Sequence, residues 1–371
     1  MSMRIAYLSI GGHIHTERWL EYFVERGHDV HLLTVQPAPI EGVRVHDIRT
    51  SIPWKPLHYA VALGRVKRIL RDISPDLLHT HFLTGYGYWG ALSGFHPFIM
   101  TVWGDDVYLT PHESFLKGRL ARRVLSEADL VTGDSRDILD RAIDMGAAPS
   151  KCHVILWGVD MKTFRPDAPS DVREKMGIPE DAPVVISVRS FTQPYYNIDT
   201  IVGVVPAVQE ARPDTHFVFA GNEGEDTEFR KMAGGLGLDE RTHFVGKIPH
   251  EEFASYLVAA DVFVSVPSVD ATAVSLLEAM ACGTSVIVSD LASSLEWVED
   301  GKTGLAIPPR NGEALEQAVL RLLDSPELRK RLGDEAVATI RERADHRAHM
   351  ARMEELAIDL VESWKDGGGS G

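Results

Sequence analysis

Short apolar runs alternate along the chain with longer segments in which apolar residues recur every three or four positions. The short runs are typical of buried parallel strands, and the longer spacing is typical of helices that pack on them. The first half predicts strands at residues 5–9, 29–34, 77–80, 98–102, 130–132 and 153–156, with helices that include 16–26, 59–72 and 113–127. The second half predicts strands at 183–188, 216–220, 243–245, 261–266 and 285–288, and helices from 314 to 364. This alternation predicts an α/β protein with parallel sheets.

The alternation breaks once, at a stretch rich in Pro, Ala and Ser that begins at Pro166, and then restarts. We therefore expect two Rossmann-like domains, residues 1–165 and 166–345, whose parallel sheets face a central cleft. Residues 346–366 predict a final helix, and the Gly-rich residues 367–371 predict a flexible tail. In open parallel sheets, ligands bind beyond the carboxyl ends of the strands, so we expect the functional residues there.

Composition narrows the functional classes. The 371 residues carry a net charge of −16, which argues against general nucleic-acid binding. The only cysteines, Cys152 and Cys282, are far apart and predict no disulfide framework, so we expect a cytoplasmic protein. No signal peptide and no apolar run of transmembrane length is evident. GxSxG, P-loop and CxxC patterns are absent, which gives hydrolase, ATPase and zinc functions no support.

Residues 268–290, SVDATAVSLLEAMACGTSVIVSD, are the most informative segment. A strand leads into a loop with Asp270 and then into a helix with Glu278. The free N–H groups and the positive dipole end of such a helix start suit a bound phosphate. Two carboxylates beside them could accept hydrogen bonds from the hydroxyls of a sugar and a ribose. The alternative is an acidic loop followed by an ordinary apolar helix.

The string LEAMACG, followed by DGKTG at 300–304, resembles the C-terminal signature of the retaining glycosyltransferases of the family 4 type (glycosyl transferases group 1), which have the GT-B fold. Matching strings occur in the family's order along nearly the whole chain: the glycine loop and first helix at 11–34, PDLLHTHF at 75–82, MTVWGDDV at 100–107 and WGVDMKTFRP at 157–166. The resemblance implies transfer of a hexose-type sugar from a UDP- or GDP-sugar, with no cofactor or metal required. It also implies that the final helix packs back on the N-terminal domain.

By this resemblance, Arg189 at the end of a strand clamps the donor diphosphate, as a guanidinium fork can. The family's partner lysine is missing, because Tyr195, Tyr196 and Asn197 stand where it would fall. Tyr196, Asn197 or Lys247, which follows Gly246, could supply the lost contact. The alternative for Arg189 is a surface ion pair.

The same resemblance makes Asp270 and Glu278 candidate catalytic residues. The family has Glu at both positions, and Asp270 is shorter by one methylene, so we expect it to report a different donor sugar. Glu278 would accept from the ribose hydroxyls. The backbone N–H groups that would face the sugar and diphosphate are those of Ala273, Val274 and Ser275.

Candidate residues of the N-terminal domain follow its strands. Gly11 and Gly12 let the backbone approach donor phosphate or acceptor closely, although they also fit a simple turn. His13 lies in the same loop and is a candidate acceptor contact. Many family members carry a His where this chain has Trp103, which we expect to form a stacking wall for a sugar.

Asp105 and Asp106 follow directly, and we expect Asp106 to orient or deprotonate the acceptor. Its alternative role is to cap the loop. His79 and His81 lie on one side of their strand. We expect His81 to touch acceptor or donor, and we expect no metal site.

Two other functions stay open. The missing lysine and Trp103 favour a degenerate sugar-nucleotide-binding protein, and the fold also admits a sugar-nucleotide epimerase. For the transferase, the expected partners are a nucleotide-sugar donor and a glycan, lipid-linked or other acceptor. Cation-rich helices at 64–73 and 115–123 predict a peripheral contact with anionic lipid at the inner face of the membrane, although they also fit ordinary solvated faces.

Overall fold

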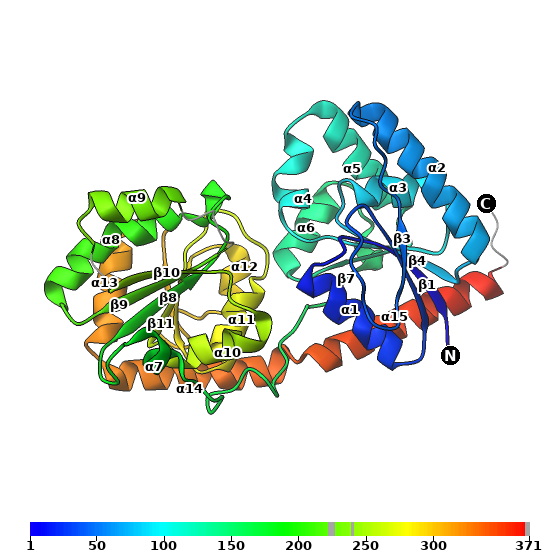
Figure 1. Cartoon of the computed structure of the whole chain (residues 1–371). Helices are drawn as coiled ribbons and strands as arrows, with labels where there is room; N and C mark the ends of the chain where they lie inside the picture. Colours follow the sequence, from blue (N-terminus) through cyan, green and yellow to red (C-terminus); the bar gives the residue numbers. More distant parts are fainter. Residues whose placement is uncertain (222–226, 239–240, 368–371) are drawn as a thin grey trace. The chain divides into compact units, whose positions relative to one another are not determined.

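The computed structural model describes residues 1–221, 227–238 and 241–367, apart from the side chains of residues 55, 56 and 227. It divides into two compact units (Figure 1). The first, the N unit, comprises Met1–Trp157 and the segment from Arg347 onward, and the second, the C unit, is Gly158–His346. Of the predicted terminal tail, residues 368–371 lie outside the described residues.

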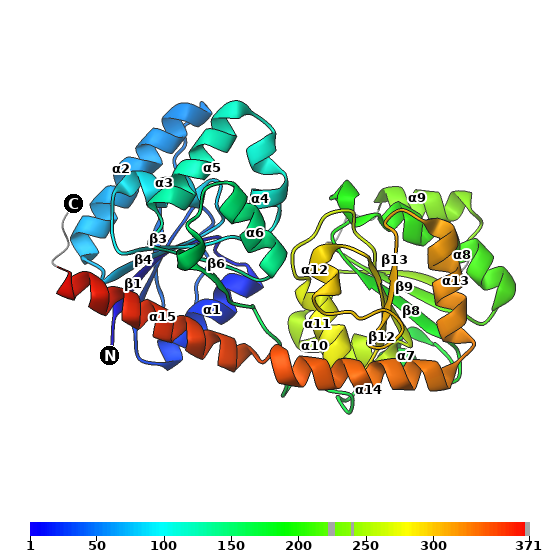
Figure 2. The same cartoon turned by 180° about the vertical axis from the view of Figure 1, so that it is seen from behind.

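The N unit is built on a parallel seven-stranded sheet in the order β3-β2-β1-β4-β5-β6-β7. Helices cover both faces of this sheet (Figures 1 and 2). Its elements are β1 (Arg4–Leu8), α1 (Ile14–Glu25), β2 (Asp29–Thr34), β3 (Arg44–Asp47), α2 (Lys55–Ile73), β4 (Leu77–His81), α3 (Tyr86–Ser93), β5 (Phe98–Thr101), α4 (Asp105–Tyr108), η1 (Thr110–His112), α5 (Phe115–Glu127), β6 (Leu130–Gly133), α6 (Arg136–Asp144), η2 (Pro149–Lys151), β7 (Cys152–Val154) and α15 (His346–Asp366).

The C unit repeats this plan with a parallel six-stranded sheet in the order β10-β9-β8-β11-β12-β13. Its elements are α7 (Val172–Met176), β8 (Val184–Val188), η3 (Pro194–Tyr196), α8 (Ile198–Ala211), β9 (His216–Ala220), α9 (Thr227–Gly235), β10 (Thr242–Gly246), α10 (His250–Ala259), β11 (Val262–Ser265), α11 (Val274–Ala281), β12 (Ser285–Ser289), α12 (Ala292–Leu295), β13 (Leu305–Ile307), α13 (Gly312–Leu323) and α14 (Pro326–Arg343). Two Rossmann-like parallel sheets confirm the predicted fold class.

The apolar runs become central strands because both faces of each sheet are covered. Every residue of β4 and β9 is buried, for example. Removing such apolar surface from water stabilises the fold by about 25 cal/mol per Å². The strand ends that carry polar side chains are thereby held on a rigid base.

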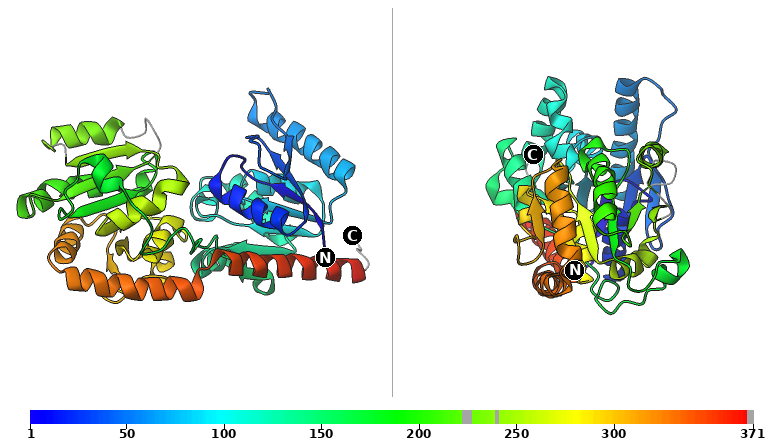
Figure 3. Two further views of the ribbon diagram at one scale, coloured as in Figure 1. Left: turned by 60° about the horizontal axis from the view of Figure 1, so that its bottom comes forward. Right: turned by 90° about the vertical axis from the view of Figure 1, so that its left-hand side faces the viewer.

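Helix α15 runs past the amino-terminal ends of the strands of the N-unit sheet (Figure 3). Glu354 in α15 accepts hydrogen bonds from the Tyr22 hydroxyl, the Arg26 Nε and the His28 Nε2, each at 3.0 Å. Trp364 stacks on His96, which precedes β5. Burial opposes ionisation of Glu354, but these three donors hold its pKa below the usual value.

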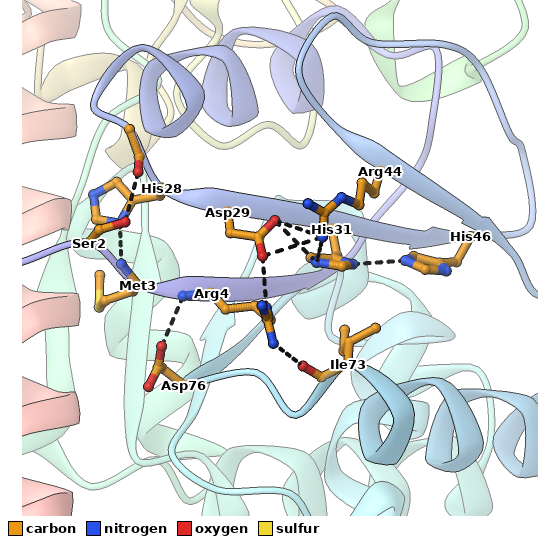
Figure 4. Close-up of polar contacts among 11 residues, drawn as sticks. Ser2, Met3, Arg4, His28, Asp29, His31, Arg44, His46, Ile73 and Asp76 are labelled. Atoms are coloured by element: carbon orange, nitrogen blue, oxygen red, sulfur yellow. Dashed lines mark hydrogen bonds and ion pairs between the residues drawn. The ribbon is translucent and has the colours of Figure 1, made fainter.

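Each unit has a pair of histidines that links two strands at corresponding places in its sheet. In the N unit, His31 on β2 meets His46 on β3 at 2.9 Å between Nδ1 and Nε2 (Figure 4). In the C unit, His216 on β9 meets His243 on β10 at 3.0 Å. In both pairs the rings are stacked, at 9° and 7° between planes. The two sheets thus repeat a side-chain contact as well as a topology.

Candidate active site

The carboxyl ends of β8, β9 and β10 line a cavity of about 280 Å³ in the C unit. Two basic residues, Arg189 and Lys247, line this cavity. The remaining lining residues are Val188, Ser190, Tyr196, Ala220, Gly221 and Ile248. Gly246, with a positive φ of 71°, ends β10 and directs the chain into Lys247. The cavity therefore brings together three predicted donor contacts, Arg189, Tyr196 and Lys247, while Gly246 lies outside its lining.

Arg189 is mostly buried and is fixed by several contacts. Its Nε and Nη2 donate to the Ser265 Oγ at 3.0 and 2.7 Å. Nη2 also donates to the Asp270 Oδ2 at 2.6 Å. The Tyr196 ring covers one face of the guanidinium, 4.9 Å from Cζ to the ring centroid. Arg189 thus belongs to an ion pair, the alternative we considered, but the pair lies at the cavity and joins two predicted site residues.

Asp270 lies in the loop between β11 and α11. Its backbone carbonyl accepts from the Ser293 Oγ at 2.8 Å, which fixes the loop. Burial raises the pKa of the Asp270 carboxyl, and the Arg189 charge and hydrogen bond oppose that rise.

Tyr196 and Asn197 follow β8 through the short helix η3. Asn197 is fully buried and has a left-handed φ of 54°. Its Nδ2 donates to the Val266 carbonyl and to the Ser268 Oγ, each at 2.8 Å. In the structure, therefore, the Asn197 amide holds the loop before Asp270, while Tyr196 faces the cavity.

Helix α11 begins after Ala273, whose extended backbone marks the N-cap. The N–H groups of Ala273, Val274 and Ser275 are at the start of the helix, where helix geometry supplies no partner. Glu278, one turn on, is buried, and its Oε1 lies 3.3 Å from the Nε2 of His250 at the start of α10. These four residues are not in the cavity lining.

In the N unit, the loop after β1 carries the predicted glycines. A Cβ on Gly11 would come within 2.1 Å of the Gln36 carbonyl oxygen, and Gly12 has a φ of 71°. The clash therefore requires glycine at position 11, and the left-handed backbone favours glycine at position 12. His13 caps α1 by accepting from the backbone N–H of His15 at 3.3 Å.

Aromatic rings and histidines gather beside this loop. The Trp103 ring lies 5.1 Å from that of His13, 5.8 Å from that of His81 and 4.8 Å from that of Trp157. His81 is fully buried; its Nδ1 bonds the Ser9 Oγ at 3.2 Å, and its Nε2 has no hydrogen-bond partner among the described residues. Burial, with smaller contributions from His79 and His13, lowers the pKa of His81 well below its usual value. Burial lowers the pKa of His79 to about 3. Both histidines are neutral at physiological pH.

Asp106 is buried under the loop that carries Trp103. Its carboxylate accepts from the backbone N–H groups of Leu83, Trp103 and Gly104, at 2.6, 3.0 and 2.7 Å. In the structure, Asp106 does cap the loop, the alternative role considered above. Burial nevertheless raises its pKa to about 6, since desolvation outweighs these hydrogen bonds. Burial also raises the pKa of Asp105.

Three residues of this arrangement were not predicted: Ser265, His250 and Trp157. Trp157 opens the string WGVDMKTFRP, but nothing in that string assigns it a place beside Trp103, and Ser265 and His250 lie in no quoted motif. Across the described ranges, no group of three or more His, Cys, Asp or Glu residues is arranged to hold a metal ion.

Two family models match the chain. The model for "Glycosyl transferases group 1" matches residues 170–339, and the model for "Glycosyl transferase 4-like" matches residues 4–135. Together they cover the site residues described above, except Trp157.

Two relatives extend this match. A D-inositol 3-phosphate glycosyltransferase of Kribbella flavida is 27% identical over 365 residues, which cover 91% of this chain and 84% of the relative. A GDP-mannose-dependent alpha-(1-6)-phosphatidylinositol monomannoside mannosyltransferase of Mycolicibacterium smegmatis is 31% identical over 55% of this chain and 56% of its own.

Among solved structures, a sucrose-phosphate synthase from Thermosynechococcus elongatus has a TM-score of 0.83 at 22% identity, over 97% of this chain and all of its own. Anabaena HepE in complex with UDP-glucose has the same TM-score at 18% identity, over 96% of this chain and all of its own. At these identities the structures show a shared fold alone.

Proposed function

Because the chain belongs to the glycosyltransferases of the group 1 and family 4 type, with the GT-B fold, we propose that it transfers a hexose-type sugar from a UDP- or GDP-sugar to an acceptor with retention of anomeric configuration. The observation that carries this proposal is the cavity at the strand ends of the C unit. Arg189 and Lys247 both line it, in a protein whose net charge is −16.

The two cations suit the donor diphosphate. Arg189 offers a fork for phosphate oxygens, and Lys247, which is exposed at the cavity, supplies the second positive charge that the family's missing lysine would carry. These charges stabilise the leaving nucleoside diphosphate as the bond to the sugar breaks. The first N–H groups of α11 add donors for the same anion.

Glu278 and Asp270 position the donor. Glu278, held by His250, accepts from the ribose hydroxyls, and Asp270 accepts from hydroxyls of the transferred sugar. HepE, a structural neighbour, is seen with UDP-glucose, and the mycolicibacterial relative is named for GDP-mannose. Donors with either base are therefore the ones to test.

The N unit presents the acceptor. Trp103 and His13 offer ring faces for a sugar or cyclic polyol, and His81 offers an Nε2 that has no hydrogen-bond partner among the described residues. Asp106 holds the loop in shape, and its pKa of about 6 suits a group that takes up the acceptor proton near neutral pH. The two relatives are named for acceptors that contain inositol, which supports a ring acceptor.

A transfer assay tests the function. Purified protein is incubated with UDP-glucose, UDP-N-acetylglucosamine or GDP-mannose, with and without a panel of inositol phosphate, glycan and lipid-linked acceptors. We expect nucleoside diphosphate to be released only when donor and acceptor are both present. Binding without release would indicate a sugar-nucleotide-binding protein, and a sugar isomer formed without acceptor would indicate an epimerase.

We also propose that helix α5 contacts anionic lipid at the inner face of the membrane. Arg119, Arg122 and Arg123 are exposed on α5, and Phe115 and Leu116 at its start are 81% and 65% exposed. Cations beside exposed apolar side chains suit a lipid surface, each cation contributing about 1 kcal/mol. No helix in the described part of the chain has the length and apolar character to cross a bilayer, so such contact would be peripheral.

Sedimentation with vesicles tests this contact. Binding should require anionic lipid, fall with salt and be lost when the three α5 arginines become Ser. The control places the same three changes at exposed positions of the C unit, Arg321, Arg331 and Arg341. Wild-type protein that stays in the supernatant at low salt would contradict the proposal and favour a water-soluble acceptor.

A further inference from the structure

The hydrogen bonds of Arg189 divide its guanidinium into two edges. One edge, formed by Nε and one hydrogen of Nη2, is filled by the Ser265 Oγ. The second hydrogen of Nη2 belongs to the edge shared with Nη1, and Asp270 accepts there at 2.6 Å. No hydrogen bond within the described residues uses Nη1.

A phosphate that binds Arg189 bidentately competes with Asp270. The edge with Nε already serves Ser265, so the phosphate oxygens need the Nη1–Nη2 edge and the N–H that Asp270 holds. Two anions cannot share that hydrogen without strong repulsion. The Asp270 carboxylate must therefore leave Arg189 when a diphosphate arrives.

Leaving is costly because the pair is shielded from water. The exposed fractions of the two side chains are 10% for Arg189 and 16% for Asp270. A carboxylate this deeply placed is destabilised unless another donor replaces the lost one. The Ser293 hydroxyl holds the Asp270 backbone, so the exchange is a movement of the side chain.

We propose that Asp270 selects nucleotide sugars against bare nucleoside diphosphates by exchanging Arg189 for the hydroxyls of the transferred sugar, an inference that rests on the donor site proposed above. A nucleotide sugar displaces Asp270 from Arg189 and supplies hydroxyl donors in return. A bare nucleoside diphosphate displaces it and supplies none. The product nucleotide is therefore bound less tightly than its contacts with Arg189 and Lys247 alone would give, which favours its release.

The test is the binding of UDP and of GDP, by calorimetry or, where binding is weak, by saturation-transfer NMR. Four proteins form a cycle: wild type, Asp270→Asn, Arg189→Gln and the double variant. Asp270→Asn should tighten binding of the bare nucleotide about tenfold, the size of one hydrogen bond to a charged group. The same change should have an effect of less than about twofold in the Arg189→Gln background, where no guanidinium is left to release. Asp324→Asn, which removes an exposed carboxylate paired with Arg212 in the same unit, is the matched control and should leave binding unchanged.

The outcomes separate this inference from the proposed function. A wild type that binds neither nucleotide contradicts the donor site itself. If the wild type binds and Asp270→Asn does not tighten binding, the donor site stands and the exchange is wrong. If Asp270→Asn tightens nucleotide binding equally in the wild-type and Arg189→Gln backgrounds, the cause is simple repulsion between Asp270 and phosphate. That result also contradicts the proposed exchange. Thermal melting of each variant checks that the fold is retained.

Discussion

In the C unit, ionised side chains stand at the strand ends, whereas in the N unit the corresponding ends carry aromatic rings and histidines. The central strand β8 leads into Arg189, while its counterpart β1 leads into Gly11, packed against the backbone of Gln36. Burial keeps His79 and His81 neutral, so the N unit offers hydrogen-bonding groups with little charge. In the proposed function, the same topology thus serves to recognise an anion in one unit and a neutral ring in the other.

Asp106 departs from this division, because it is a carboxylate buried in the N unit, as Asp134 after β6 also is. If it takes up the acceptor proton, Asp106→Asn should lower kcat about a hundredfold, within the range for a general base. Its pKa of about 6 means that kcat/KM of the wild type should rise with pH through that value, because only the ionised form accepts a proton. The variant should lose this acid limb.

The control is Asp105→Asn in the same turn. A folded Asp106→Asn protein that keeps the acid limb would assign the limb to another group. The role of Asp106 would then be structural, through its hydrogen bonds with the backbone of Leu83, Trp103 and Gly104.

Glu278 extends the charged character of the C unit into α11. Glu278→Gln keeps the shape of the side chain but removes the negative charge of the carboxylate that would accept hydrogen bonds from the ribose hydroxyls. We expect nucleotide binding to weaken about thirtyfold, the effect of roughly 2 kcal/mol. Titration calorimetry with UDP and GDP measures it, and unchanged affinity in a folded variant would exclude the ribose contact. His250→Ala should give a smaller loss, since His250 acts through Glu278.

The fold was largely predictable from the sequence because buried strands are continuous apolar runs. β2 and β9 match their predicted bounds. Two strands were missed. β3, Arg44–Asp47, is a short edge strand with exposed polar ends, and β13, Leu305–Ile307, has three residues. Neither is long enough to show a period.

The candidate site was predictable only where a motif marks it. The motif predicted Asp270 and Glu278 as candidates, and the family resemblance at a strand end predicted Arg189. The contact between Arg189 and Asp270 spans 81 residues and depends on side-chain rotamers, which no sequence pattern encodes. Likewise, the burial of Asn197 against the loop at 266–268 follows from the turn of η3.

Substitutions of Trp103 test the proposed acceptor site among the aromatic rings of the N unit. Trp103→Ala should raise the acceptor KM about tenfold, in line with 1 to 3 kcal/mol for ring stacking, and leave the donor KM unchanged. Trp103→Phe should recover most of the loss, since it keeps an aromatic face. An equal rise in both KM values would indicate a general loss of structure instead.

The histidine pairs are the feature that the two units share, so they test whether the units also respond alike. His46→Leu, whose side chain cannot hydrogen-bond, removes the bond to His31, and His243→Leu removes the bond to His216. Each should cost about 1 kcal/mol at pH 8, a fall of about 2 to 4 °C in Tm for a unit of this size. Thermal melting measures both.

The pH dependence of the N-unit pair follows from its surroundings. Burial lowers the pKa of His31 and His46; Asp29 opposes this at His31, while Arg44 reinforces it at both rings (Figure 4). A histidine with a lowered pKa in the folded state stabilises the fold above its unfolded pKa, about 6.5, and this contribution is lost as the pH falls below it. The difference in stability between wild type and His46→Leu should therefore shrink between pH 8 and pH 5. A difference that stays constant over this range would show that His46 does not titrate with folding, and that the pair stabilises the sheet by packing alone.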